Sequence, residues 1–355
     1  MPKEDTTMTK RLLIVILLTC LALAVVATSA FAQNKKIGTA TATELLIPVG
    51  ARDLAMGGSS IATTKGAEAM YWNPAGMGRM KHSAEGMFSS MTYIADIGVN
   101  YGAVAGSFGE FGAIGLSVKT LSFGDIPLTT EDDPENTSGK FFSPAYVIVG
   151  VSYSRPLTDA VSVGATVKII SEQIERVSAS GMAFDFGVLY NGLIGIQGFD
   201  LGVAVKNIGP QMKFDGTGLY RTATSSDGRR PEQKYKSDAA SFELPSVVEI
   251  GLAYEAKVGD NMIGSLTGSF TNNSLYLDEY RVGGEFGITL ESLQLFGRAG
   301  LGMVPQAEAK ENIFGATFGA GITYAATGIT ITLDYAYRQV EFFDANNVFS
   351  VKLGF

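Results

Sequence analysis

Alternation of apolar and polar residues is the dominant pattern along most of the chain. Residues 162–169, SVGATVKI, place Val, Ala and Ile at every second position, with Ser, Gly, Thr and Lys between them. Residues 329–338, ITITLDYAYR, alternate in the same way. A period of two is the spacing of a β-strand, because successive side chains point to opposite faces.

Segments with this period, bounded by turn residues, predict fourteen strands. They span residues 84–93, 97–108, 111–123, 143–156, 159–173, 179–190, 198–207, 243–257, 261–271, 278–290, 292–303, 310–325, 327–340 and 342–355.

These strands suit a membrane-spanning β-barrel better than a soluble β-sandwich. Each is as long as a tilted strand that crosses a bilayer, or somewhat longer, whereas sandwiches use fewer and shorter strands. One face is aliphatic and aromatic, and the other carries Gly, Ser, Thr and occasional charge. No apolar run after residue 33 approaches the length of a spanning helix. We therefore predict an all-β fold, a closed fourteen-stranded antiparallel barrel with lipid outside and a polar lumen.

The connections between strands support this topology. The two long ones, 124–142 and 208–242, fall on the same side of a barrel whose N-terminus lies in the periplasm. Most connections on the opposite side are tight turns, and 191–197 is the longest of them. Short periplasmic turns and longer external loops are typical of outer-membrane barrels.

The last eight residues, VFSVKLGF, give a separate indication of the outer membrane. Phe349, Val351, Leu353 and Phe355 lie on one face of the final strand. This pattern is similar to the terminal signal read by the outer-membrane barrel assembly machinery. The alternative is an ordinary closing strand of a soluble domain.

The N-terminus predicts export. Lys10 and Arg11 precede an apolar run from residue 12 to about 27, and Ala30-Phe31-Ala32 offers a cleavage site before Gln33. The alternative is an N-terminal anchor, but the run is short for a span. Cys20, the only cysteine, lies inside this run, so the mature chain has neither disulfides nor thiol chemistry.

Composition argues against several other functions. The net charge of −8 and pI near 4.9 disfavour nucleic acid as a partner. The single histidine, His82, has no catalytic motif beside it and is interpreted as an ordinary exposed residue. One His and one Cys cannot build a metal cluster, and the acidic residues 131–135 do not follow a calcium-loop pattern. We expect no enzymatic activity and no cofactor.

The segment before the first strand, residues 33–83, consists of short pieces broken by Gly and Pro and predicts a compact plug or hatch. It contains YWNPAG, residues 71–76, in which Asn73 should cap a helix that starts at Pro74. The predicted domains are a signal peptide at 1–32, the plug at 33–83 and the barrel at 84–355.

The run LLIPVGARDLAMGGSSIATTKGAEAMYWNPAGM, residues 45–77, resembles the N-terminal hallmark of the PorV/PorQ family of FadL-like outer-membrane proteins. VKNIGPQMKF, ELPSVVEIGLAYE and the closing strands resemble the same family. The resemblance implies a fourteen-stranded barrel whose lumen is partly filled by the N-terminal segment. The motif residues that carry it are Gly50, Ala51, Arg52, Met56, Gly57, Gly58, Tyr71, Trp72, Asn73, Pro74, Ala75 and Gly76.

The resemblance implies a non-enzymatic accessory of type IX protein secretion. The partners would be outer-membrane lipid, the barrel assembly machinery, and secreted proteins or secretion-system subunits. The alternative is a FadL-like channel that takes up fatty acids or other hydrophobic molecules. The long loops are polar and charged, which suits a protein surface better than a hydrophobic capture groove. Within the plug, Tyr71 and Trp72 are expected to wedge against the inner barrel wall.

Overall fold

The computed structural model describes residues 40–224, 231–307 and 312–355. The chain divides into two compact units, 1–35 and 36–355, and only the second contains described residues. The predicted signal peptide, its cleavage site at Ala32 and Gln33, and Cys20 all lie outside the described residues. Among the residues that are described, no helix is both long and apolar enough to cross a membrane.

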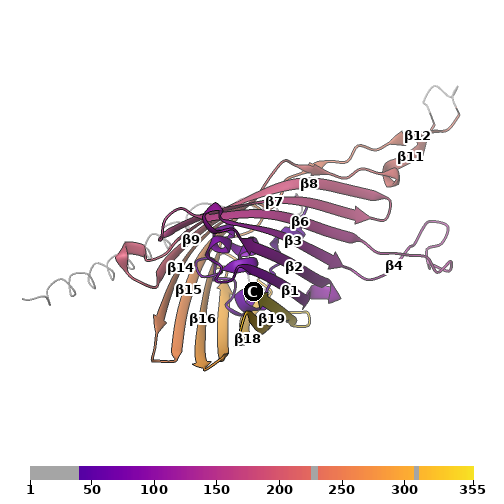
Figure 1. Cartoon of the computed structure of the whole chain (residues 1–355). Helices are drawn as coiled ribbons and strands as arrows, with labels where there is room; N and C mark the ends of the chain where they lie inside the picture. Colours follow the sequence, from indigo (N-terminus) through magenta and orange to yellow (C-terminus); the bar gives the residue numbers. More distant parts are fainter. Residues whose placement is uncertain (1–39, 225–230, 308–311) are drawn as a thin grey trace, which may run out of the picture. The chain divides into compact units, whose positions relative to one another are not determined.

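Fourteen antiparallel strands form one closed barrel (Figure 1), as the alternation predicts. The ring closes where β1 pairs with β20, from Glu85 opposite Gly354 to Thr92 opposite Asn347. The strands are β1 (Ala84–Thr92), β2 (Gly98–Ser107), β3 (Ala113–Ser122), β6 (Ala145–Pro156), β7 (Val161–Ile174), β8 (Val177–Tyr190), β9 (Phe199–Ile208), β14 (Val247–Lys257), β15 (Met262–Asn273), β16 (Glu279–Leu290), β17 (Leu293–Met303), β18 (Phe314–Ala326), β19 (Ile329–Val340) and β20 (Asn346–Gly354).

Two strands, β14 and β20, start four residues later than predicted. β14 begins at Val247 and not at 243, because Pro245 has no N–H for the ladder. β20 begins at Asn346 and not at 342, because Phe342 has a φ of 71° and belongs to the preceding turn. β18 begins at Phe314, and its predicted start at residue 310 lies outside the described residues.

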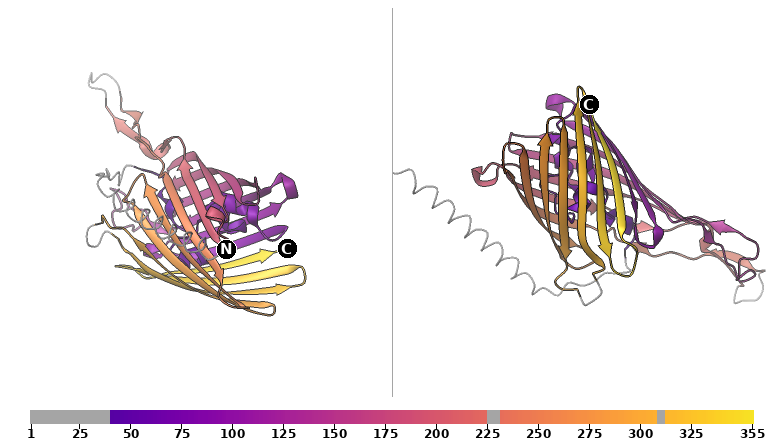
Figure 2. Two further views of the ribbon diagram at one scale, coloured as in Figure 1. Left: turned by 90° about the vertical axis from the view of Figure 1, so that its left-hand side faces the viewer. Right: turned by 90° about the horizontal axis from the view of Figure 1, so that it is seen from below.

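The two long connections contain short hairpins of their own. The loop between β3 and β6 holds β4 (Ile126–Pro127) paired with β5 (Phe141–Phe142). The loop between β9 and β14 holds two further pairs, β10 (Met212–Lys213) with β13 (Ser241–Phe242) and β11 (Tyr220–Ala223) with β12 (Gln233–Lys236). The right-hand view of Figure 2 shows these hairpins at the end of the barrel opposite the C-terminus. The long loops therefore share one end, as predicted.

Most strands point polar side chains inward and apolar ones outward. Ser154, Thr166 and Asp185 are buried in the lumen, whereas Leu266 and Phe349 are exposed on the outer face. β1 and β2 depart from this rule.

The inward residues of β1 and β2 include Met87, Val99 and Tyr101, which are buried. They form apolar clusters with Met70 and Leu54 of the N-terminal segment, so these two strands supply the wall against which that segment buries its core.

The segment before β1 lies inside the barrel as a series of short helices (Figure 1). None exceeds six residues, and a Gly or Pro lies at or near one end of each. They are η2 (Thr43–Leu46), α2 (Ala51–Ala55), η3 (Gly66–Glu68), α3 (Ala69–Trp72) and η4 (Pro74–Arg79). Single turns in the connections are η5 (Ile94–Asp96), η6 (Gly109–Phe111), η7 (Leu193–Gly195) and η8 (Thr217–Leu219). The described part of this segment, residues 40–83, is called the plug.

Candidate functional site

A buried ion network ties the plug to the barrel wall. Arg52 of α2 binds Glu285 of β16 at two points, Nε to Oε2 at 3.1 Å and Nη2 to Oε1 at 2.9 Å. Arg298 also contacts Glu285, at 2.5 Å, and reaches Asp334 at 2.6 Å. Because two arginines share Glu285 and Arg298 also binds Asp334, the buried charges compensate one another.

Backbone contacts continue the attachment along α2. The Ala51 N–H donates to Ser350 Oγ at 2.8 Å, and Thr317 Oγ1 donates to the Ala55 carbonyl at 2.9 Å. Gly57 follows with a φ of 68°, and a Cβ there would lie 2.9 Å from the Leu301 backbone nitrogen. Only glycine permits both this conformation and this approach to the wall.

The YWNPAG stretch forms the predicted turn. Tyr71 and Trp72 end α3, and Asn73 caps η4 by accepting a hydrogen bond from the Ala75 N–H at 3.2 Å. The Asn73 amide also donates to the Ile61 carbonyl at 3.0 Å and to the Val188 carbonyl of β8 at 3.2 Å. Asn73 thus joins the turn to the plug interior and to the barrel wall.

Glycines in the wall make room for this turn. A Cβ at Gly187 would lie 2.1 Å from Asn73 Oδ1, and a Cβ at Gly164 would lie 2.4 Å from the Pro74 carbonyl carbon. Both positions point into the lumen. The absence of side chains here lets the plug backbone touch the sheet.

Tyr71 and Trp72 contact both the plug and lysines of the wall. The Tyr71 hydroxyl donates to the Ile47 carbonyl at 2.9 Å, and the Trp72 indole N–H donates to the Val49 carbonyl at 3.0 Å. The ammonium groups of Lys119 and Lys206 lie 5.0 and 5.4 Å from the centre of the Tyr71 ring. These are cation–π distances, so the pair is held electrostatically as well as by packing.

Burial raises the pKa of two carboxyl groups of the plug, which favours their protonated forms. Burial, and then the nearby Glu172 carboxylate, raises the pKa of Glu44 to about 8. Burial and Asp53 raise the pKa of Glu68 to about 7. Protonation of Glu44 near neutral pH avoids a second buried negative charge beside Glu172.

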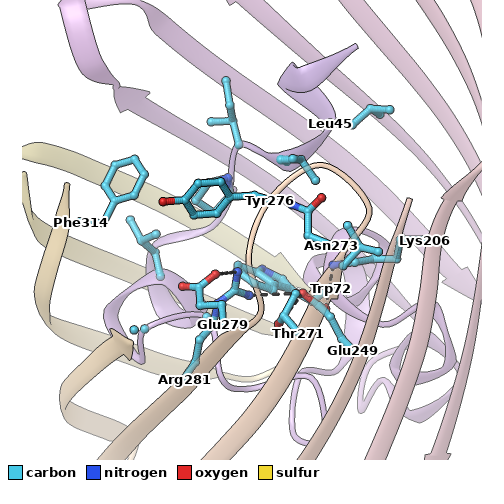
Figure 3. A pocket seen from close by; sticks show the side chains of 18 of the residues that line it. Leu45, Trp72, Lys206, Glu249, Thr271, Asn273, Tyr276, Glu279, Arg281 and Phe314 are labelled. Carbon is cyan, nitrogen blue, oxygen red and sulfur yellow. Dashed lines mark hydrogen bonds and ion pairs between the residues drawn. The ribbon is translucent and has the colours of Figure 1, made fainter. Parts of the chain in front are cut away.

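A chamber of about 490 Å³ lies between the plug and the barrel wall, and Tyr71 and Trp72 are among its lining residues. Figure 3 shows Trp72 in this lining. Leu45, Ile47, Leu54 and Phe314 are among its apolar lining residues. Its remaining surface is charged and polar. This mixture of apolar and charged lining is characteristic of a ligand site.

The charged lining is largely paired. Glu249 accepts from Lys206 at 2.8 Å and from Arg281 at 3.2 Å, and Arg281 also binds Glu279 at 2.6 Å (Figure 3). Arg338, which also lines the chamber, stacks 3.9 Å from the centre of the Phe314 ring.

Comparison with known families decides the assignment. The family model described as "Type IX secretion system protein PorV" matches residues 29–225, which is more than half of the chain of 355 residues. This chain belongs to the PorV family. The resemblance seen in the plug motif is thereby confirmed. No curated protein matches the sequence significantly.

Solved structures share the fold of this PorV-family barrel. The toluene transporter TodX of P. putida is 14% identical, with a TM-score of 0.55, and the match covers 87% of this chain and 99% of that one. The toluene transporter TbuX of Ralstonia pickettii is 14% identical, with a TM-score of 0.53, covering 87% and 98%. At this identity the likeness shows a common FadL-like fold. Family and fold together make this an outer-membrane β-barrel.

The remaining motif residues of the PorV-family plug are buried. Met56 and Ala75 have no exposed surface, and a Cβ at Gly76 would lie 2.0 Å from the Thr64 carbonyl oxygen. Gly58 faces the Trp72 ring, and Gly50 has a φ of 84°. The structure thus gathers every motif residue in the lumen.

The C-terminal residues lie elsewhere. Phe349, Val351 and Phe355 are exposed on the outer face of the barrel, at positions that face lipid. The geometry agrees with the one-face pattern, and the role of these residues in barrel assembly stays a prediction.

His82 is not the exposed histidine that we expected. It is half-buried, with Nδ1 3.2 Å from Glu85 Oε1 and Nε2 3.0 Å from Thr330 Oγ1. Because Glu85 also accepts from the Ala67 N–H at 3.0 Å, His82 belongs to the plug attachment.

The acidic loop 131–135 forms a local turn. Asp133 accepts hydrogen bonds from Thr137 and Ser138, and those bonds, with Ser138 the largest contributor, hold the pKa of Asp133 well below its usual range. Among the described residues, no group of acidic, His or Cys side chains suits a metal ion.

Sequence reasoning missed the ionisable side chains of the wall that face the lumen, of which Glu285 binds the plug. Glu285, Arg298, Asp334 and Arg338 all occupy inward positions of alternating strands. Ionisable residues are costly at membrane depth and usually mark a functional contact. That signal was present in the pattern, but pairing it with Arg52 required the barrel register.

Proposed function

We propose that this chain is a non-enzymatic carrier of type IX secretion, which reaches the outer membrane through its cleaved signal peptide and captures exported proteins at its external loops. The family match carries the proposal. Secretion-system subunits of the same membrane are the second class of partner. In this proposal residues 33–83 seal the lumen. The barrel, residues 84–355, supports the loops.

The filled lumen supports binding over passage. The plug contacts β8 through Asn73, β16 through Arg52 and β20 through the Ala51 N–H. We infer that the seated plug blocks the passage of a polypeptide through the lumen while these bonds hold. The cargo-binding surface is therefore expected at the loops and not within the barrel wall.

The loop between β9 and β14, which carries the β11–β12 hairpin, offers such a surface. Every residue of β11 and β12 is exposed. Two surface ion pairs link the two sides of this loop, Lys213 with Asp238 and Lys236 with Asp215, each at 2.5 Å. Exposed polar backbone and side chains on a positioned hairpin suit a protein partner.

Deletion of the hairpin tests this proposal. Residues 220–236 would be replaced by a short Gly-Ser linker in the full chain. After gentle detergent extraction and affinity purification, the wild type should recover exported proteins and translocon subunits, and the deletion variant should lose the exported proteins. Cells with the variant should hold surface proteins in the periplasm.

The matched control removes the other long loop, residues 126–142, by the same linker strategy, and it should still recover exported proteins, because we place the main capture surface on the 220–236 hairpin. Both variants must keep the heat-modifiable electrophoretic mobility of a folded barrel. Equal recovery of exported proteins by the wild type and the 220–236 deletion would contradict the loop-capture proposal.

A second candidate, uptake of hydrophobic small molecules, is favoured by the chamber. Its volume of about 490 Å³ and its apolar lining suit a small ligand. TodX and TbuX, which share the fold, are toluene transporters. This candidate predicts that gene deletion abolishes growth on a hydrophobic nutrient while secretion continues.

A further inference from the structure

Two carboxyl groups meet inside the plug. Asp53 of α2 has no exposed surface, and Glu68 of η3 is 2% exposed. Their carboxyl groups are hydrogen-bonded to each other. Two ionised carboxylates cannot make that bond, since neither carries a proton to donate. The contact therefore requires one proton on the pair.

The surrounding donors place this proton on Glu68. Asp53 Oδ1 accepts hydrogen bonds from three groups, Ser60 Oγ, Thr64 Oγ1 and Arg52 Nη1. Such bonds favour the ionised form of Asp53. Asp53 Oδ2 and Glu68 Oε1 are also buried, and no donor among the described residues reaches either atom. A proton that Glu68 holds and donates to Asp53 supplies the missing donor.

Charged and titratable groups from five elements act on Glu68 or on the ammonium group beside it. They are Arg52 and Asp53 of α2, Glu85 of β1, Tyr101 of β2, Asp334 of β19 and Lys352 of β20. Behind them, His82 contacts Glu85, Glu285 binds Arg52, and Arg298 binds Asp334. Burial and then Asp53 outweigh the two cations Lys352 and Arg52, so the pKa of Glu68 rises from 4.5 to about 7.

Glu68 touches both the plug interior and the barrel wall. Gly50, at the start of α2, has a φ of 84°, and a Cβ there would lie 2.3 Å from Glu68 Oε1. On the other side, Lys352 Nζ of β20 lies 3.3 Å from Glu68 Oε2. A change in the charge of Glu68 therefore acts on the packing of α2 against η3 and on the attachment to β20.

We propose that Asp53 and Glu68 form a pH-dependent switch, in which a shared proton keeps α2 and η3 packed together and its loss loosens the plug. When the proton passes to solvent, two carboxylates remain in contact in a buried place and repel each other. The inference goes beyond the proposed function, because it concerns how the plug is held and does not depend on what the loops bind.

The switch acts between acid and neutral pH. Glu68 in a released plug would have its ordinary pKa of 4.5, whereas in the seated plug its pKa is about 7. The seated plug binds the proton more tightly, so this stabilisation is complete below pH 4.5 and is lost as pH rises through about 7. Between these values each pH unit should shift the seating equilibrium by about tenfold.

Trp72 reports whether the plug is seated, because it is the only tryptophan in the sequence and is buried in α3, directly after η3. The full protein in lipid nanodiscs would be titrated with urea at several pH values from 4.5 to about 8. The readout is the urea midpoint of the change in Trp72 emission. Infrared difference spectra between the wild type and Glu68→Gln would follow the carbonyl band of the protonated carboxyl group.

The wild-type midpoint should fall as pH rises towards about 7, and the carbonyl band should be lost with a midpoint near that pH. Glu68→Gln should show a smaller fall, since its amide is uncharged at every pH and still donates to Asp53. Adding Glu68→Gln to Glu44→Gln should flatten the profile further than Glu44→Gln alone. That comparison separates the switch from the contact between Glu44 and Glu172.

The control variant is Glu110→Gln, which removes an exposed carboxylate from η6 between β2 and β3. It should follow the wild type. The proposal is overturned if the difference spectrum lacks the carbonyl band at pH 4.5, or if the wild type and Glu68→Gln have the same pH profile. If Glu68→Gln does not fold, Glu44→Gln alone gives the infrared readout, and absence of a band that is lost near pH 7 would overturn the proposal.

Discussion

Arg52 of the plug and Glu285 of β16 form a two-point ion pair that joins the two parts of the molecule. Both side chains are largely shielded from solvent, and Arg298 approaches the same carboxylate from the wall. Arg52 of the plug therefore binds a carboxylate that is also paired with Arg298 of the barrel wall.

Arg52→Gln should loosen the plug without unfolding the barrel. Glu285 keeps Arg298 after the substitution, so the expected loss is about 2 kcal/mol, less than for a fully orphaned buried charge. Protease cleavage within residues 40–83 should accelerate in the variant. Lys81→Gln, at an exposed plug position, is the charge-matched control and should behave as the wild type. Equal cleavage rates for Arg52→Gln and wild type would contradict this role.

Gly187→Ala should destabilise the seated plug by about 1–3 kcal/mol, because the added methyl group would overlap Asn73. Gly102→Ala is the matched control, since a Cβ there meets open space on the outer face. Urea unfolding in lipid would compare the two midpoints. If Gly102→Ala shifts the midpoint as much as Gly187→Ala does, the loss of stability comes from replacing any strand glycine and not from overlap with Asn73.

Trp72→Ala should raise the conductance of a folded barrel. The substitution removes the indole that lines the chamber and bonds to the Val49 carbonyl. The cost of such a cavity is about 3–5 kcal/mol. Planar-bilayer recording would measure the conductance, and Trp72→Phe should give a smaller change. Loss of the heat-modifiable folded form, without any conducting barrel, would indicate that Trp72 serves packing alone.

Stability of the plug should fall as pH rises from about 4.5 towards 8. The pKa of Glu44 rises from its ordinary value of 4.5 to about 8 in the folded protein, because burial favours the protonated form. The folded state therefore binds the proton more tightly, so this stabilisation is complete below 4.5 and is lost as pH rises through the folded pKa. Melting temperatures across this range should fall less for Glu44→Gln than for the wild type. Identical pH profiles would contradict the assignment.

The strand pattern was readable from the sequence because lipid imposes alternation on every barrel strand. All fourteen strands and the shared end of the long loops followed from it. The cap at Asn73 was also readable, since Asn before Pro at a helix start is a local signal. Contacts such as Arg52 with Glu285 could not be derived, because the partners are 233 residues apart and meet only through the closed register.

Strands β1 and β2, whose inward side chains are partly apolar, show a second limit. Their inward Met87 and Tyr101 follow the same alternation as lipid-facing residues elsewhere. Which face meets lipid depends on what fills the lumen, and periodicity alone does not contain that information. His82 was expected to be exposed because its partner Thr330 lies on β19, far away in the sequence, so the local sequence does not reveal this contact.

Secretion with a covalently locked plug would show whether the chain carries exported proteins while its lumen stays sealed. Cysteines at Ala55 and Thr317, which are already in hydrogen-bond contact, would link the plug to β18, and the only natural cysteine is Cys20 in the predicted signal peptide. Disulfide formation would be verified by a reductant-sensitive mobility shift. In a strain that lacks the native gene, the oxidised and reduced proteins should restore surface delivery of exported proteins equally. Delivery that stops on oxidation and returns on reduction, or a deletion strain that secretes normally, would contradict carriage past a sealed lumen.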